Sequence, residues 1–286
     1  MKAVELFAGA GGAALGLQAA GVEHLRCIEK DEDAAATLAG AGFPAIRGDV
    51  RELGHYDLLS PDLVWSSFPC QCWSKGGKRK GAQDERNGFP WTVDALEVLR
   101  PRWCILENVP GLTTHREGCD PVCLGPELCP AAYLDHVIFP ELLRFFECVD
   151  MRLLNASSYG VPQRRHRLFV VAGPSRITWP EPTHGKPTDQ IDLWGQRLLP
   201  WVTAGEALGL NGARLIGGGR NDSDPNRSPR TYRDLTDEPC TTIAAAQIGN
   251  AGPWVVPSDE VDAVGAITPD SLRYASKRTI SLEECS

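Results

Sequence analysis

Short apolar runs, each followed by a polar or glycine-containing segment, recur along the first 172 residues of the chain. The runs predict buried strands, and several of the stretches between them have the periodicity of helices. The predicted strands cover 3–7, 25–28, 45–47, 63–65, 103–106, 151–154 and 168–172, and the predicted helices cover 13–20, 33–38 and 131–148, the last bent or divided at Pro140. Strands that alternate with helices indicate an α/β protein with a doubly wound sheet.

The composition changes after Gly173, where prolines become frequent and glycine-rich stretches follow. Such a shift is typical of a linker that leads into a loop-rich lobe. We therefore predict a large domain at 1–175 and a smaller lobe that begins at residue 176.

Acidic residues end two of the predicted strands: Glu29 follows the second and Asp49 follows the third. Gly9 and Gly11 lie in the turn after the first strand, where glycine permits close approach of a cofactor to the start of a helix. Glu29, about 20 residues further on, is placed to accept hydrogen bonds from ribose hydroxyls, and Asp49 could accept one from an adenine amino group. This pattern suits any adenosine cofactor, so a NAD-dependent dehydrogenase stays open.

Cys70 is the candidate nucleophile, because it lies directly behind Pro69 in the loop after strand 63–65. In an open α/β sheet, such loops are where ligands meet side chains. A cysteine is more often a small buried hydrophobe, and that is our interpretation of Cys72. A basic, glycine-rich segment at 75–81 follows.

The composition limits the possible classes of protein. The chain has 286 residues, a formal net charge of −8 and ten cysteines. A nucleic-acid partner would therefore need a local basic face. We expect a cytoplasmic protein, because no signal segment opens the chain and no apolar run reaches the roughly 20 residues of a membrane helix. Reduced thiols, a metal site or a nucleophile then suit the cysteines better than disulfides.

One segment is rich in possible metal ligands. His115, Cys119, Cys123 and Cys129 lie within one stretch that has no hydrophobic period, and could supply a tetrahedral zinc site. His136 is an alternative fourth ligand. A loop with unbound thiols, stiffened by glycine and proline, is the other interpretation.

A basic segment enters the predicted strand at 168–172. Arginines so close to a buried strand are costly unless they face a polyanion or carboxylates. Arg165 and Arg167 alternate onto one side of an extended chain, which favours such a role, whereas Arg164 could lie in a solvated turn.

Taken together, these residues resemble the C5-cytosine-specific DNA methyltransferase family. The matching segments follow the family order between residues 3 and 172: the cofactor loop at 5–12, the nucleophile segment at 68–71, the loop segment at 78–86, Glu107-Asn108-Val109, and 163–167. The resemblance implies a Rossmann-like S-adenosylmethionine-dependent sheet at 1–175 and a small target-recognition region at 176–272. It also implies that S-adenosylmethionine is bound by Phe7, Gly9, Gly11, Glu29, Asp49 and Pro69.

The resemblance further implies the chemistry. Cys70 would add to carbon 6 of a cytosine flipped out of duplex DNA, and Glu107 would share a proton with ring nitrogen 3. Arg165 and Arg167 would hold the base carbonyl and the flanking phosphate. The segment 75–86 would close over the base. The expected role is restriction-modification or protection of a phage.

The chain departs from the family near its end. Residues 273–286 resemble the start of the segment that returns to the large domain, but the Gly-Asn-Ala-Val-Pro-Pro motif does not follow. We therefore expect that a second chain could complete the protein. The alternatives are a methyltransferase acting on tRNA cytosine, and an inactive or split chain that binds DNA.

Overall fold

The structure is a computed structural model. It describes residues 1–56, 58–69, 87–115, 129–186 and 198–208, together with short strands within 214–216, 232–234, 239–241, 254–256 and 278–279.

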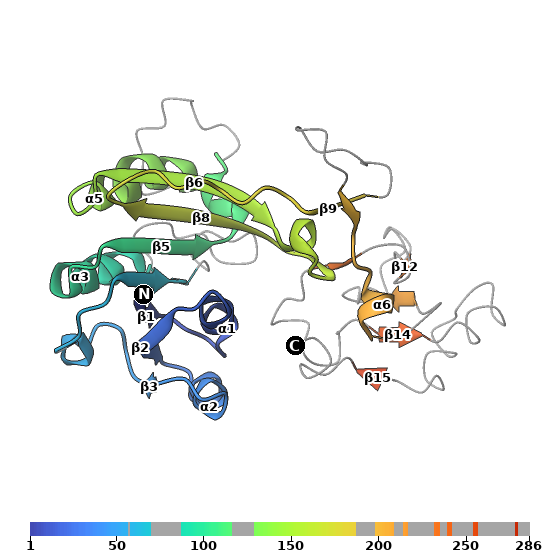
Figure 1. The fold of residues 1–286 in the computed structure, drawn as a ribbon, viewed down its shortest axis with the longest axis horizontal. Helices are drawn as coiled ribbons and strands as arrows, with labels where there is room; N and C mark the ends of the chain where they lie inside the picture. The colour runs from blue at the N-terminus through green and yellow to red at the C-terminus, as the bar shows by residue number, and fades with distance from the viewer. Residues whose placement is uncertain are drawn as a thin grey trace, which may run out of the picture. The chain divides into compact units, whose positions relative to one another are not determined.

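A seven-stranded sheet in the order β3-β2-β1-β4-β5-β8-β6 dominates the first part of the chain (Figure 1). Its strands are β1 (Lys2–Leu6), β2 (Glu23–Glu29), β3 (Ala45–Arg47), β4 (Leu63–Ser66), β5 (Trp103–Asn108), β6 (Cys148–Asn155) and β8 (His166–Gly173). β1 to β5 pair in parallel, whereas β8 runs antiparallel to β5. The order reverses between β1 and β4, and ligands of open α/β sheets bind at the carboxyl ends of strands beside such a reversal. The predicted α/β fold is confirmed.

Helices pack on both faces of this sheet. They are α1 (Gly12–Ala19), α2 (Glu32–Gly40) and α3 (Phe89–Leu99), and short 3₁₀ turns lie at η1 (Leu53–Tyr56) and η3 (Pro110–Thr113). Val4 and Leu6 of β1 belong to the main buried cluster, together with Leu96 of α3. Ala14 of α1 and Leu38 of α2 belong to a second cluster, with Cys27 of β2. Side chains alternate across a strand, so Ala3 and Glu5 face away from the Val4 and Leu6 side.

The helix predicted over 131–148 is shorter and irregular. It consists of α4 (Pro130–Tyr133), a π-helical turn η4 (Leu134–Ile138) and α5 (Phe139–Leu142). Pro140 lies in the first turn of α5, and a proline removes one helical hydrogen bond, which a π turn accommodates. The prediction is wrong beyond Leu142, because Cys148 already begins β6.

The chain divides into two compact units. The first comprises 1–154 and 166–179, and the second comprises 155–165 and 180–286. These ranges differ from the predicted domains chiefly at 155–165, which belongs to the second unit. The second unit contains η5 (Ala156–Tyr159), β7 (Gln163–Arg164), β9 (His184–Gly185), β10 (Leu199–Pro200), α6 (Ala204–Leu208), β11 (Arg214–Ile216), β12 (Tyr232–Asp234), β13 (Cys240–Thr241), β14 (Trp254–Val256) and β15 (Arg278–Thr279).

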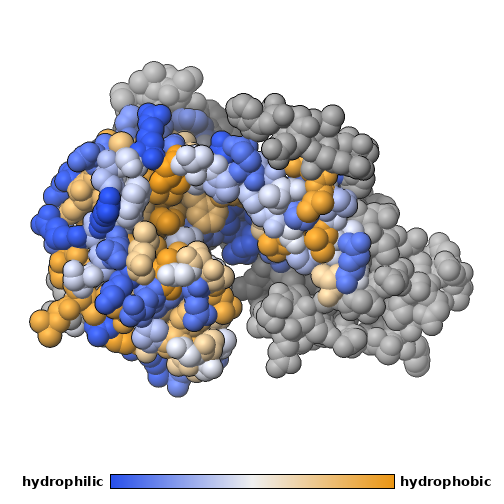
Figure 2. All heavy atoms as spheres, in the orientation of Figure 1, coloured by the Kyte–Doolittle hydropathy of each residue, from blue (hydrophilic) through white to orange (hydrophobic). Residues whose placement is uncertain are grey.

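On the face drawn in Figure 2, hydrophilic and apolar residues are interspersed over the described surface. Within the described ranges, no helix has both the length and the apolar composition that a bilayer crossing requires.

Candidate active site

A pocket of about 540 Å³ opens at the carboxyl ends of the parallel strands. Phe7 follows β1, Glu29 ends β2, Asp49 follows β3 and Pro69 follows β4, and all four line the pocket. The structure therefore brings together four of the six residues predicted to bind a cofactor. The remaining lining residues are Ile28, Lys30, Gly48, Val50, Arg51, Ser67 and Trp91.

The other two predicted cofactor residues, Gly9 and Gly11, shape the turn beside the pocket. Both have positive φ, +57° at Gly9 and +99° at Gly11, where residues other than glycine are strained. Gly11 caps α1, and a Cβ atom there would lie 2.6 Å from Cδ1 of Leu38. The Gly9 N–H donates a hydrogen bond to Oε2 of Glu29 at 2.7 Å, and the Asp31 N–H donates to Oε1 at 2.8 Å. Glu29 thus holds the glycine turn against the end of β2.

Phe7 adopts a backbone conformation that is rare for a bulky residue, with φ of +56°. Such conformations cost on the order of 1–3 kcal/mol and are concentrated at functional sites. The Phe7 ring approaches Gly88 so closely that a Cβ on this glycine would lie 2.7 Å from Cζ of Phe7. The same Cβ would lie 3.1 Å from Cδ of Pro69. Glycine at position 88 therefore leaves space for Phe7 and Pro69, which both line the pocket.

Asp49 is held by two cations that the sequence analysis did not identify. Lys30 Nζ lies 3.0 Å from Oδ2, and Arg51 donates from Nε to Oδ1 at 2.9 Å and from Nη2 to Oδ2 at 2.5 Å. The Arg51 hydrogen bonds hold the pKa of the Asp49 carboxyl well below its usual range. The Arg51 guanidinium also lies 4.9 Å from the centre of the Trp91 ring. Trp91 belongs to α3, a helix that the sequence analysis did not predict.

Glu107 and Arg167 form an ion pair in the first unit. Arg167 Nε lies 2.8 Å from Glu107 Oε1, and the two side chains are 17% and 20% exposed. Glu107 is paired with Phe169 across β5 and β8, so Arg167 is its diagonal neighbour on the same face. Arg165, which was predicted to hold the base carbonyl and the flanking phosphate together with Arg167, belongs to the second unit.

Asn108 ties this pair to the segment that carries the predicted nucleophile. Its side-chain amide donates to the carbonyl of Phe68 at 3.2 Å and accepts from the N–H of Val109 at 2.9 Å. Asn108 therefore holds the backbone two residues before Cys70 next to the end of β5. Cys70 itself and the segment 75–86 lie outside the described residues.

The predicted zinc site is described only in part. His115 Nδ1 lies 3.5 Å from the Cys129 sulfur, while Cys119 and Cys123 lie outside the described residues. His136, the alternative ligand, is exposed on η4. A zinc ion at these residues stays a prediction.

Comparisons with known proteins agree with this geometry. A profile of the C-5 cytosine-specific DNA methylase family matches residues 1–192. The Type II methyltransferase M.NaeI of Lentzea aerocolonigenes is 39% identical over 255 residues, which cover 82% of this chain and 58% of that protein. M.AplI of Arthrospira platensis is 37% identical over 178 residues, 62% of this chain and 47% of that protein. The chain thus spans about half the length of these two relatives.

A solved structure shows the same fold. It is described as a DNA modification methyltransferase encoded within a prophage of E. coli, with a TM-score of 0.52 and 21% identity, covering 82% of this chain and 60% of that one. The ordered segments from the glycine turn to β8 all fall within the profile match at residues 1–192. The chain belongs to the C-5 cytosine-specific DNA methylase family.

Proposed function

We propose that this chain transfers a methyl group from S-adenosylmethionine to carbon 5 of cytosine in double-stranded DNA. The observation that carries this proposal is the arrangement around Pro69. This residue lines the cofactor-sized pocket, and the Phe68 carbonyl before it is bound by Asn108, the neighbour of Glu107. The residue that follows Pro69 is Cys70. Membership of this family excludes the alternative of a NAD-dependent dehydrogenase. A dehydrogenase would also leave Cys70 and Glu107 without a catalytic role.

Two carboxylates of the pocket support S-adenosylmethionine as the cofactor. Glu29 would accept hydrogen bonds from the ribose hydroxyls, and Asp49 from the adenine amino group. Because both Asp49 oxygens already accept from Arg51 or Lys30, binding of the adenine would exchange at least one of these contacts. When bound, the cofactor supplies an electrophilic methyl group on a sulfonium.

The remaining chemistry falls to side chains of the chain. The Cys70 thiolate would form a bond to carbon 6, and the electron pair of the 5,6 double bond would then bond carbon 5 to the methyl group as the bond from that methyl to the sulfonium sulfur breaks, its electron pair remaining on sulfur. Glu107 in its protonated form would stabilise the adduct by sharing that proton with ring nitrogen 3. Arg167 is placed by its 2.8 Å ion pair to orient the Glu107 carboxyl. Loss of the carbon 5 proton to a base then expels the thiolate and restores the aromatic ring.

Replacement of Cys70 tests this proposal. Cys70→Ala is expected to lower methyl transfer from labelled cofactor to duplex DNA by more than about 1000-fold, with cofactor affinity unchanged in calorimetry. Cys72→Ala is the matched control in the same segment and should retain activity. Methyl transfer by Cys70→Ala would show that another group is the nucleophile.

The same assay separates the alternatives. Purified chain is offered duplex DNA and tRNA, and incorporation into RNA alone would replace DNA with tRNA as the substrate. The second chain predicted from the sequence stays a prediction, and methyl transfer by the single purified chain would make it unnecessary.

The relatives are named Type II methyltransferases, and we infer a corresponding role in protecting DNA from restriction. Bisulfite mapping of DNA from cells that express the chain should show methylated cytosines within one short recurring sequence. Methylation scattered without a common sequence would argue against this role.

A further inference from the structure

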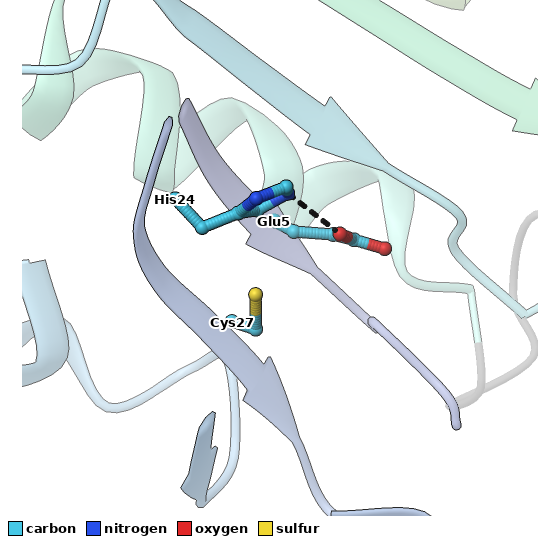
Figure 3. A group of neighbouring side chains, drawn as sticks. All are labelled: Glu5, His24 and Cys27. Carbon is cyan, nitrogen blue, oxygen red and sulfur yellow. Dashed lines mark ion pairs between the residues drawn. The ribbon is translucent and has the colours of Figure 1, made fainter. Parts of the chain in front are cut away.

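Three side chains that could bind a metal ion meet between β1 and β2, away from the residues predicted as zinc ligands. They are Glu5 of β1 and His24 and Cys27 of β2, and their ligand atoms all lie within 4.8 Å of one another. Figure 3 shows the three side chains directed toward one common space, with Glu5 Oε2 at 3.4 Å from His24 Nε2.

An irregularity in the strand pairing brings these residues together. Ala3 pairs with His24 and Glu5 pairs with Cys27, but the register shifts by one residue between Ala3 and Val4. In a regular strand, residues three apart point to opposite faces. The extra residue in β2 therefore places His24 and Cys27 on the same face as Glu5, which is the kind of re-aiming that a β-bulge produces.

The cluster is enclosed and lacks hydrogen bonds. The side chains of His24 and Glu5 are only 2% and 1% exposed. Neither carboxylate oxygen of Glu5, nor Nε2 of His24, has a hydrogen-bond partner among the described residues. The surroundings are apolar: Cys27 packs with Ala14 and Leu38, and the ring of Phe43 meets that of His24 edge-on at 5.2 Å. Buried polar groups normally form hydrogen bonds, and buried charges are paired or coordinate a metal.

We propose that Glu5, His24 and Cys27 bind a zinc ion. Carboxylate oxygen, imidazole nitrogen and thiolate sulfur are the zinc ligands of proteins, with bonds of roughly 2.0–2.3 Å in tetrahedral geometry. Two ligands in such a tetrahedron are about 3.4 Å apart, which matches the 3.4 Å between Glu5 and His24. A carboxylate and a thiolate together cancel the two positive charges of the ion, so the filled site is neutral.

The position of the site indicates a structural role. Glu5 is two residues before Phe7, and Cys27 is two residues before Glu29, and both Phe7 and Glu29 line the cofactor pocket. A metal bridge between β1 and β2 would lock the two strands beneath the glycine turn. Structural zinc sites usually have four protein ligands, so with three the fourth tetrahedral position would be taken by water or another small donor.

Metal analysis of the purified full chain tests the proposal. We expect about one zinc ion per chain from this site. Glu5→Gln, His24→Gln and Cys27→Ser should each weaken zinc binding by more than the 10–100-fold that loss of an outer-shell partner costs. The matched control is Cys104→Ser, since Cys104 is also a fully buried cysteine of the same sheet but belongs to the other cluster.

The double variant Cys119→Ser/Cys123→Ser separates this site from the predicted site in the loop. It should leave the zinc at Glu5, His24 and Cys27 in place.

Cobalt provides a spectroscopic readout of the ligands around the metal. In the Cys119→Ser/Cys123→Ser background, the chain reconstituted with Co²⁺ should show a thiolate-to-metal charge-transfer band, and addition of Cys27→Ser, with the fold retained by circular dichroism, should abolish it. Metal-free unsubstituted chain in the presence of excess zinc, or a cobalt spectrum without a thiolate band, would overturn the proposal and leave a buried Glu–His pair. Retention of the band when Cys27→Ser is added to Cys119→Ser/Cys123→Ser would overturn it as well.

Discussion

Two glutamates on neighbouring strands of one sheet, Glu29 and Glu5, have opposite surroundings. Glu29 lies at the rim, where backbone N–H groups of Gly9 and Asp31 donate to its two oxygens at 2.7 and 2.8 Å. Glu5 lies inside, where its oxygens accept no hydrogen bond from a described residue, and burial raises the pKa of its carboxyl. The difference follows from the sheet itself, because backbone donors are used by the strand ladder inside and become available only in the loops at its ends.

This contrast separates two tasks for a carboxylate. At the rim, Glu29, Asp49 and Glu107 have donors or cations beside them and stay available to a ligand. Inside, the ion pair that Glu5 makes among the described residues is with His24, at 3.4 Å. Substitutions at the rim should therefore alter function more than stability, and substitutions inside should do the reverse.

The largest effect is expected at Glu107. Glu107→Gln removes the proton that would be shared with ring nitrogen 3, and general acid–base groups contribute about 10²–10⁴-fold to rates. We expect a loss of kcat in this range, with the midpoint of thermal unfolding nearly unchanged. The control is Glu97→Gln, which removes an exposed carboxylate that pairs with Arg144 at 3.3 Å. Equal losses of activity and stability in Glu107→Gln would break the distinction between rim and interior.

The next effect is expected at Glu5 and depends on the metal. With zinc at 100 times its Kd, the unsubstituted chain should gain about 2.7 kcal/mol in the free energy of unfolding, and Glu5→Leu should gain none. With a chelator, Glu5→Leu should be more stable than the unsubstituted chain by about 1–3 kcal/mol, because an unpaired buried group has been removed. Denaturant titrations with zinc and with a chelator measure these free energies of unfolding. An unsubstituted chain with the same free energy of unfolding in both conditions would contradict the prediction.

A smaller effect is expected at Glu29. Glu29→Gln removes the negative charge and replaces one of the two accepting oxygens with an NH₂ group, which cannot accept a hydrogen bond from a backbone N–H. Hydrogen bonds to charged groups contribute about 1.5–3 kcal/mol each. Loss of one such bond to the glycine turn should weaken cofactor affinity by about tenfold in calorimetry. Glu23→Gln is the control at the exposed start of the same strand. Unchanged cofactor affinity in Glu29→Gln would show that the glycine turn does not need this anchor.

The smallest effect is expected at Asp49 and appears only in acid. Because its pKa is depressed in the folded protein, the stability that its ion pairs provide is present above the unfolded pKa of about 3.9 and is lost as the pH falls through the lower folded value. Its partners are largely exposed, with Lys30 at 74% and Arg51 at 53%, so the contribution should stay below about 1 kcal/mol. The stability difference between Asp49→Asn and the unsubstituted chain should be constant from pH 5 to 8 and shrink below pH 4. A difference that changes between pH 5 and 8 would mean that Asp49 titrates there.

Much of the pocket at the carboxyl ends of the strands could be predicted from the sequence. Apolar runs that end in Glu29, Asp49 and Pro69 place these residues at one edge, because the carboxyl ends of parallel strands share that edge. Glycine at positions 9 and 11 likewise indicated a turn with positive φ, which only glycine adopts freely.

Other contacts gave no local signal. Lys30 and Arg51 look like ordinary surface cations in the sequence, and Trp91 looks like a core residue. Lys30 and Arg51 meet at Asp49, and Trp91 lies against Arg51, because β2, β3 and α3 are packed around one pocket. The alternation of side chains along an extended segment also could not predict that Arg165 and Arg167 belong to different units.

By itself, the sequence determined the α/β order of the chain, the polar residues at the strand ends and the family, since each depends on local periodicity and on short ordered motifs. Only the tertiary structure decided that Glu5, His24 and Cys27 meet, because residues three apart share a face only when a register shift intervenes. Such a shift arises from the pairing of two strands, and neither strand encodes it alone.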